Sequence, residues 1–149
     1  MEYFKLEEYE FLNWEHRRTL IELTNDINVR TYFNDFERYV NNIIEHGKEN
    51  NINKAYVVSK EDEIVGMIMI DYLDPRYYIS YALLPNKRHE RLGTLLLSDF
   101  VEYLFQSGLD IDKLFLEINA SNVASIKTAL NVGFQRYGKT GYYISNYHR

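Results

Sequence analysis

Apolar residues along the chain follow two spacings, which predict an alternation of strands and helices. Short runs rich in aromatic and β-branched residues predict strands at residues 1–6, 55–59, 63–71, 76–84 and 113–118, and two more within 134–147, joined near residues 138–141. Apolar residues three and four apart predict helices at residues 7–23, 34–48 and 122–132, and another from residue 92 to the stop at 107–108. Residues 24–28 are predicted to form a turn.

The order of these segments predicts how the strands pair. Short connections, such as Lys60-Glu61-Asp62 and Asp74-Pro75, favour an antiparallel meander of the three strands between residues 55 and 84. The strand at residues 113–118 follows a long helix, so a right-handed crossover places it parallel to the strand at 76–84. We therefore expect an α/β (α+β) domain whose mixed sheet is mostly antiparallel and contains one parallel pair.

Composition narrows the class of protein. The 149 residues, 46% hydrophobic and 26% charged, suit one globular domain spanning residues 1–149. A formal net charge of -5 argues against a general nucleic-acid binder and mildly favours amine substrates. The absence of cysteine excludes disulfides, thiolate metal sites and cysteine nucleophiles. Without a membrane-length apolar run or a basic, apolar leader, the chain is expected to be cytoplasmic, with no membrane partner.

A basic loop within residues 83–97 carries the first sign of a binding site. Lys87, Arg88, His89 and Arg91 lie just before or inside the first turn of a predicted helix, whose unpaired N–H groups and dipole favour an anion. Gly93 removes a side chain where a ligand needs close approach to the backbone. We expect a phosphate or pyrophosphate here; the alternative is a solvated basic loop. No Gly-Lys-Ser/Thr occurs, which excludes a Walker-type phosphate loop.

A second block, Leu116-Glu117-Ile118-Asn119-Ala120-Ser121-Asn122, is followed at fixed offsets by Ser125 and Gly133-Phe134. Together with Arg88 and Gly93, this block resembles the GNAT superfamily of N-acetyltransferases, whose loop signature Arg/Gln-x-x-Gly-x-Gly/Ala cradles the pyrophosphate of acetyl-CoA. Arg91 stands where that signature has its first glycine. Within the superfamily the second block, with Tyr81-Ala82-Leu83 before Pro85, looks closest to the Rim-type acetyltransferases that modify ribosomal proteins and other protein N-termini.

The resemblance implies the GNAT fold, with six to seven strands, about four helices and a central parallel pair splayed into a cofactor cleft. It implies acetyl-CoA as a co-substrate and no metal. The strand before the basic loop would pair with the pantetheine arm, and N–H groups of residues 89–94 would meet the pyrophosphate. The implied cofactor-binding residues are Ala82, Leu83, Leu84, Arg88, His89, Glu90, Arg91, Leu92, Gly93, Thr94, Asn122 and Ser125.

Acetyl transfer to an amine requires a group that takes the amine proton. Glu117 matches the glutamate that serves as this base in Rim-type enzymes, so the resemblance implies that it is catalytic. Its position alone favours the alternative, a glutamate at a strand end that makes one salt bridge or faces solvent. Asp71 is a weaker candidate because it ends a predicted hairpin strand. Asn119, Asn122 and Ser125 are candidates for holding substrate or cofactor, although asparagine at a helix start is more often a cap.

One position departs from the family pattern. The tyrosine that usually protonates the departing CoA sulfur would lie four residues after Ser125, where this chain has Ala129. Since a thiol has a reference pKa of about 8.5, CoA thiolate is a tolerable leaving group even without a dedicated acid. Tyr142 and Tyr143 on the last predicted hairpin are candidates to replace the missing hydroxyl.

Three functions are therefore compatible with the chain. The first is an acetyl-CoA-dependent N-acetyltransferase that acts on a primary amine, and the second, motivated by Ala129 and Arg91, is a catalytically inactive GNAT-fold module that binds CoA or acyl-CoA. The third, a phosphate-binding α/β domain unrelated to acetyl-CoA, leaves the second block unexplained. The acceptor is open among a peptide N-terminus, a polyamine, an antibiotic and other amines, and an exposed edge strand favours a homodimer.

Overall fold

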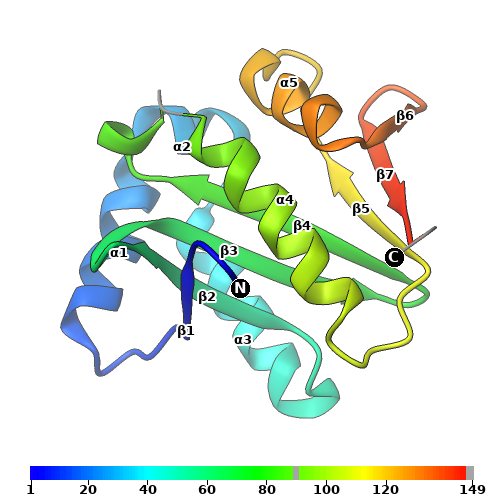
Figure 1. Cartoon of the computed structure of the whole chain (residues 1–149). Helices are drawn as coiled ribbons and strands as arrows, with labels where there is room; N and C mark the ends of the chain where they lie inside the picture. Colours follow the sequence, from blue (N-terminus) through cyan, green and yellow to red (C-terminus); the bar gives the residue numbers. More distant parts are fainter. Residues whose placement is uncertain (89–90, 147–149) are drawn as a thin grey trace.

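A seven-stranded mixed sheet with helices on both faces forms the body of the molecule (Figure 1). The structure is a computed structural model that describes residues 1–88 and 91–146. The strands are β1 Lys5–Glu8, β2 Lys54–Lys60, β3 Glu63–Leu73, β4 Arg76–Leu83, β5 Lys113–Glu117, β6 Gln135–Tyr137 and β7 Gly141–Ser145. The helices are α1 Trp14–Asn25, α2 Ile27–Tyr32, α3 Phe36–Asn50, the short 3₁₀ helix η1 Pro85–Lys87, α4 Leu92–Phe105 and α5 Val123–Val132.

The strand order is β1-β2-β3-β4-β5-β7-β6. The antiparallel meander predicted from the short connections is confirmed as β2–β3–β4, and the predicted parallel pair is confirmed as β4 and β5. The two last strands form the expected hairpin, with β7 inserted between β5 and β6. The sheet is therefore antiparallel everywhere except at its centre.

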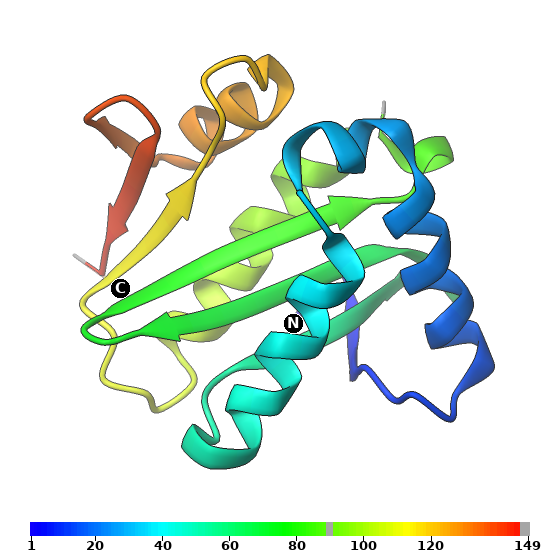
Figure 2. The ribbon, with the colours of Figure 1, turned by 180° about the vertical axis from the view of Figure 1, so that it is seen from behind.

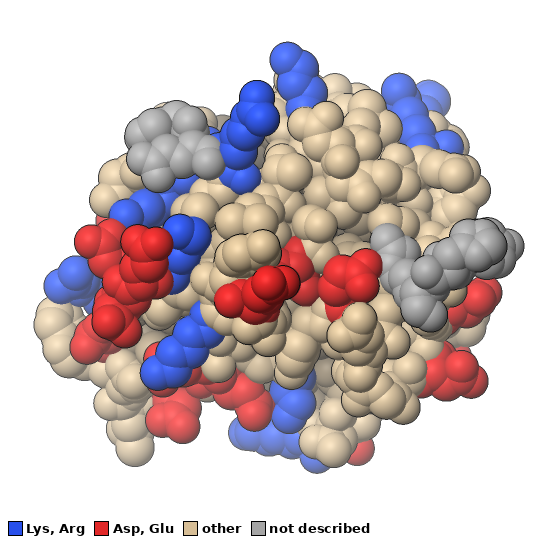
Figure 3. Space-filling view, viewed as in Figure 1, with Lys and Arg blue, Asp and Glu red and all other residues tan. Residues whose placement is uncertain are grey.

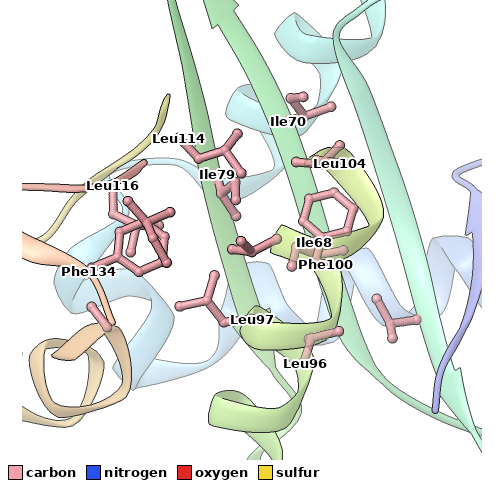
Figure 4. Close-up of a cluster of buried hydrophobic side chains, with 14 of the residues drawn as sticks. Ile68, Ile70, Ile79, Leu96, Leu97, Phe100, Leu104, Leu114, Leu116 and Phe134 are labelled. Carbon is pink, nitrogen blue, oxygen red and sulfur yellow. The ribbon is translucent and has the colours of Figure 1, made fainter. Parts of the chain in front are cut away.

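Alternation along the central strands divides the interior into two layers. In β3, Ile68 and Ile70 point into a core shared with α4 and α5, whereas Met67 and Met69 point into a second core beneath α1 and α3. Figure 4 shows the first core, in which apolar side chains of α4 interdigitate with those of the strands and with Phe134. Because both faces of the central strands are covered, their edges are the main part of the sheet left for a ligand.

The N-terminal third differs from the prediction. Residues 5–8, expected in part to be helical, pair instead with β2, and the first helix begins only at Trp14, where the Asn13 side chain accepts hydrogen bonds from the N–H groups of Glu15 and His16. The predicted turn at residues 24–28 contains the start of α2, capped by Asp26. At six residues α2 is too short to show an apolar period, so the described residues form five α-helices where about four were expected.

The parallel pair is short, and this opens the centre of the sheet. Strands β4 and β5 pair only at Tyr77 with Leu114 and at Tyr78 with Phe115. Beyond these pairs the strands diverge, with β5 leading to α5 and β4 to the basic loop (Figure 2). The splayed pair expected from the family resemblance is confirmed, and the edge of β4 from Ile79 onward faces the gap.

Candidate active site

A cavity of about 450 Å³ lies where the end of β4, the start of α4 and the start of α5 meet. Eight of the predicted cofactor-binding residues line it: Ala82, Leu83, Arg88, Arg91, Gly93, Thr94, Asn122 and Ser125. Leu92 is instead buried in the core, and the Leu84 N–H donates to the Val65 carbonyl oxygen. His89 and Glu90 lie outside the described residues. We call this space the first cavity.

Arg91 has the backbone conformation that the family signature leads one to expect of a glycine. Its φ of 56° is left-handed, and it occupies the cap position of α4 without making a side-chain capping bond. The first turn of α4 is thus left without a side-chain acceptor from its cap residue. The loop keeps the required turn although Arg91 replaces the glycine, and it gains a basic side chain on the cavity wall.

Arg88 makes contacts within the protein. Its Nη2 donates to Asp26 Oδ2 at 2.7 Å, and its Nε donates to the Leu83 carbonyl oxygen at 3.1 Å. Burial raises the pKa of Asp26, but the hydrogen bond from Arg88 and the N–H bonds at the start of α2 outweigh this and lower the pKa below its usual value. The guanidinium therefore joins the basic loop to α2. Figure 3 shows other basic side chains beside the start of α4, with acidic ones among them.

Gly93 lies in the first turn of α4 and faces the first cavity. A Cβ added there would come within 3.6 Å of Leu83 and 3.8 Å of Thr128, which are ordinary van der Waals distances. The protein's own packing therefore tolerates a side chain at this position. A ligand that approaches the backbone would be the reason for the glycine.

A second cavity of about 390 Å³ lies on the other side of the β4–β5 gap. It is lined by the ends of β3 and β5, by the middle of β4, and by residues of α2, α3 and the segment between these helices. Its wall includes aromatic rings and two carboxylates, which belong to Tyr32, Phe33, Tyr39, Tyr78, Asp71 and Glu117. Its polarity is the reverse of that of the first cavity, whose described wall carries arginines and no acid.

Glu117 ends β5 and is exposed at the second cavity. The Thr140 hydroxyl donates to its two carboxylate oxygens at 3.3 and 3.4 Å. The side chain is thus held loosely at the point where β5 leaves the sheet, open to solvent and to a substrate. Asn119, a candidate for holding substrate or cofactor, lines the same cavity. Its side-chain oxygen accepts hydrogen bonds from the N–H and hydroxyl of Ser121.

Asp71 is more enclosed than a solvated strand end. Strand β3 continues to Leu73, and Asn53 Nδ2 donates to Asp71 Oδ1 at 3.0 Å. Burial raises the pKa of Asp71, while the Asn53 hydrogen bond and nearby His46 partly offset the rise. The polar loop at residues 49–54 gave no sequence signal that Asn53 would be buried and would hold a cavity carboxylate.

Five residues line both cavities: Tyr32, Phe33, Tyr81, Asn122 and Ser125. Asn122 is also the cap of α5, as expected, and its Oδ1 accepts the Ser125 N–H at 3.3 Å. Tyr81 projects from β4 to α5, where its hydroxyl lies beside the hydroxyls of Ser125 and Thr128. Burial raises the pKa of Tyr81, and these two neighbouring hydroxyls partly offset the rise.

Tyr81 meets α5, the helix that carries the position where the family pattern has its tyrosine. Ala129, one turn beyond Ser125, is completely buried in the core. Tyr142 is also buried in that core, and the Tyr143 hydroxyl donates to Gln135; neither lines the two cavities. From the sequence, Tyr81 was recognised only as part of the Tyr81-Ala82-Leu83 motif and was not predicted to be a site residue. The alternation of side chains along a strand does not show which helix a given side chain will contact.

Within residues 1–88 and 91–146, no group of three or more histidine or acidic side chains is placed to hold a metal ion. Within the same part of the chain, no helix combines the length and the apolar character that crossing a membrane requires.

Comparison with known proteins gives both a family and structural neighbours. The family model described as Acetyltransferase (GNAT) family matches residues 7–134. Spermidine N-acetyltransferase from Vibrio cholerae, solved with CoA and spermine, superposes with a TM-score of 0.75 at 15% identity, covering 97% of this chain and 96% of that one. N-acetyltransferase PseH from Campylobacter jejuni, solved with acetyl coenzyme A, gives 0.73 at 17% identity, with 96% and 99% covered.

A third neighbour is the ribosomal-protein α-N-acetyltransferase RimL in complex with CoA, with a TM-score of 0.73 at 14% identity and coverage of 97% and 95%. No curated protein sequence matches this chain. At these identities the solved structures establish a shared fold, to which the family match adds a signature over most of the chain.

Proposed function

The chain belongs to the GNAT family of acetyltransferases, and from that membership we propose that it transfers the acetyl group of acetyl-CoA directly to a primary amine. The observation that supports this most strongly is the meeting of the two cavities at the β4–β5 gap. One cavity has the polarity to take an anionic donor, and the other has the polarity to take a cationic acceptor. Direct transfer requires that the two substrates meet.

The first cavity is suited to the cofactor. Backbone N–H groups at the start of α4, together with Arg91 and Thr94, would bind the pyrophosphate, and Gly93 would allow its close approach. The free edge of β4 up to Leu83 would pair with the amides of the pantetheine arm. The three structural neighbours named above were solved with CoA or acetyl-CoA, which supports this assignment.

Glu117 is the proposed general base. An amine attacks only when neutral, so its proton must leave as the C–N bond forms and the C–S bond breaks. Glu117 is exposed on the cavity wall beside the gap, within reach of an amine directly or through one water. The proton ends on Glu117 or on solvent, and the products are the acetamide and CoA.

Tyr81 is the proposed partner of the leaving sulfur. Of the residues shared by both cavities, three carry a hydroxyl, and the Tyr32 hydroxyl already points to the Ser121 carbonyl oxygen, 3.5 Å away. Ser125 carries an aliphatic alcohol, a weaker acid than a phenol. A tyrosine hydroxyl is protonated at neutral pH, and burial raises the pKa of Tyr81 further, so this group can donate a hydrogen bond to the departing thiolate.

A binding module without catalytic activity is the second candidate, favoured by the burial of Ala129 where a proton donor is expected. Calorimetric titration with acetyl-CoA, followed by an acceptor screen covering peptides, polyamines, aminoglycosides and simple amines, separates the two. Acetyl transfer supports the enzyme. Tight binding of acetyl-CoA with no transfer to any acceptor supports the module, and failure to bind acetyl-CoA contradicts both.

A further inference from the structure

Asp71 is held in the second cavity by the side-chain amide of a buried asparagine. Asn53 is 2% exposed, and its Nδ2 donates to Asp71 Oδ1 at 3.0 Å. Its Oδ1 accepts the Tyr72 N–H at 2.9 Å and Asn50 Nδ2 at 3.0 Å. Both ends of the amide are thus fixed, which fixes the Asp71 carboxylate as well.

The carboxylate is only partly compensated. No lysine or arginine among the described residues forms a salt bridge with Asp71. One of its oxygens accepts the Asn53 amide, and burial opposes its charge. His46 is the basic residue whose charge acts on this carboxylate, and it offsets the effect of burial only in part. A half-buried carboxylate without a salt bridge to lysine or arginine becomes more favourable when a cationic ligand binds beside it.

The walls around Asp71 suit such a ligand. Tyr39 and Ser80 are joined by a 2.7 Å hydrogen bond between their hydroxyls, and Phe33 and Tyr78 add ring faces to the same cavity. Aromatic faces attract ammonium groups when water is displaced. The site thus combines a fixed negative charge with apolar, electron-rich walls.

Asp71 and Glu117 lie on the same face of the sheet but on different strands. Asp71 pairs with Tyr78 of β4, Tyr78 pairs with Phe115 of β5, and Glu117 follows two residues later. Strand spacing and rise put the two Cα atoms at least about 12 Å apart, because β5 diverges from β4 beyond Phe115. With side chains turned inward, their carboxylates suit two nitrogens of one extended molecule.

We propose that Asp71 is a specificity-determining residue that binds a second, protonated amino group of the acceptor, so that the acceptor is a small linear amine with at least two amino groups. This inference rests on the proposed function, since Glu117 must receive the reacting amine. Extended-chain geometry gives a separation of about four to six carbon atoms between the two nitrogens. The 390 Å³ cavity accommodates a molecule of that size.

Steady-state kinetics with matched acceptors tests the proposal. Diaminoalkanes of four to six carbons and the n-alkyl monoamines of equal length are compared at saturating acetyl-CoA. The wild type should give a kcat/KM at least about 10-fold higher for each diamine than for its monoamine. Asp71→Asn, which keeps an oxygen to accept from Asn53, should remove most of this preference by raising KM for diamines while leaving the monoamines within about 2-fold.

Asp62→Asn is the matched control, because it removes the same charge at an exposed turn at the other end of β3. It should leave the diamine preference unchanged. Equal kcat/KM for diamines and monoamines in the wild type would overturn the proposal while leaving the acetyltransferase intact. A loss of kcat in Asp71→Asn that is equal for both acceptor types would also overturn it, because that would make Asp71 a base. Absence of transfer to every amine would instead contradict the proposed function itself.

Discussion

The two cavities on either side of the β4–β5 gap are built in different ways. The first is made largely of backbone edges and helix starts, with Arg91 and Thr94 on its wall, and it suits a polyanion. The second is made of side chains from β3, β4, β5 and the α2–α3 region, with two carboxylates among aromatic rings. Under the proposed function, this difference in charge would direct the two substrates to separate cavities, and they would meet at Tyr81.

The largest expected effect comes from the acceptor side. Glu117→Gln should lower kcat by about 100-fold or more, because general-base assistance contributes that much, while the Kd for acetyl-CoA stays the same. Initial-rate assays over a range of pH measure kcat, and calorimetric titration measures the Kd for acetyl-CoA. An undiminished kcat at every pH would remove Glu117 from the reaction.

The next largest effect is expected at Tyr81, which lines both cavities. Tyr81→Phe should lower kcat by about 10- to 100-fold with acetyl-CoA, and Tyr32→Phe serves as the control. With an acetyl thioester of a much more acidic thiol the Tyr81→Phe defect should shrink, because a stable thiolate needs no proton. A defect of the same size with both donors would mean that Tyr81 only supports packing.

A substitution in the first cavity should have smaller effects, one on folding stability and one on the affinity for acetyl-CoA. Gly93→Ala should stabilise the protein by about 0.5–1 kcal/mol, because alanine favours a helix and its Cβ meets only ordinary contacts. The same change should weaken acetyl-CoA binding by about 10-fold if pyrophosphate approaches this backbone. Thermal unfolding and calorimetry give the two numbers. Stabilisation with unchanged affinity would place the pyrophosphate elsewhere.

The smallest effect on the reaction is expected at Arg88. Because its guanidinium is bonded to Asp26 and Leu83, Arg88→Ala should cost about 1–2 kcal/mol of folding stability and change kcat little. The pKa of Asp26 is lowered in the folded protein, so its contribution is present above the usual carboxyl pKa and is lost as pH falls through the lowered value. Denaturation of wild type and Arg88→Ala should therefore converge at acid pH. A constant difference between them down to the lowest pH would contradict the ion pair.

The same contrast explains what the sequence could predict. The meander, α4 and the parallel β5 follow from local periodicity and from the handedness of crossovers. The first cavity follows from residues at fixed spacing on either side of α4. The short α2 and the late start of α1 depended on the capping side chains of Asp26 and Asn13, which compete with turns at the same positions.

The second cavity was much less predictable. Its carboxylates are 46 residues apart in the sequence, and Asp71 is held by Asn53 from a polar loop that reads as solvated. Tyr81 meets Ser125 only because β4 and β5 part beside α5. Such contacts depend on tertiary packing, which local propensity does not encode.

The most direct test incubates the protein with acetyl-CoA and a panel of primary amines and follows acetylated amine and free CoA together. Transfer across the β4–β5 gap predicts that both products form in equal amounts with at least one amine, and that Glu117→Gln loses both while still binding acetyl-CoA. Saturable binding of acetyl-CoA to the wild type with no acetylated amine would contradict transfer and leave a CoA-binding module.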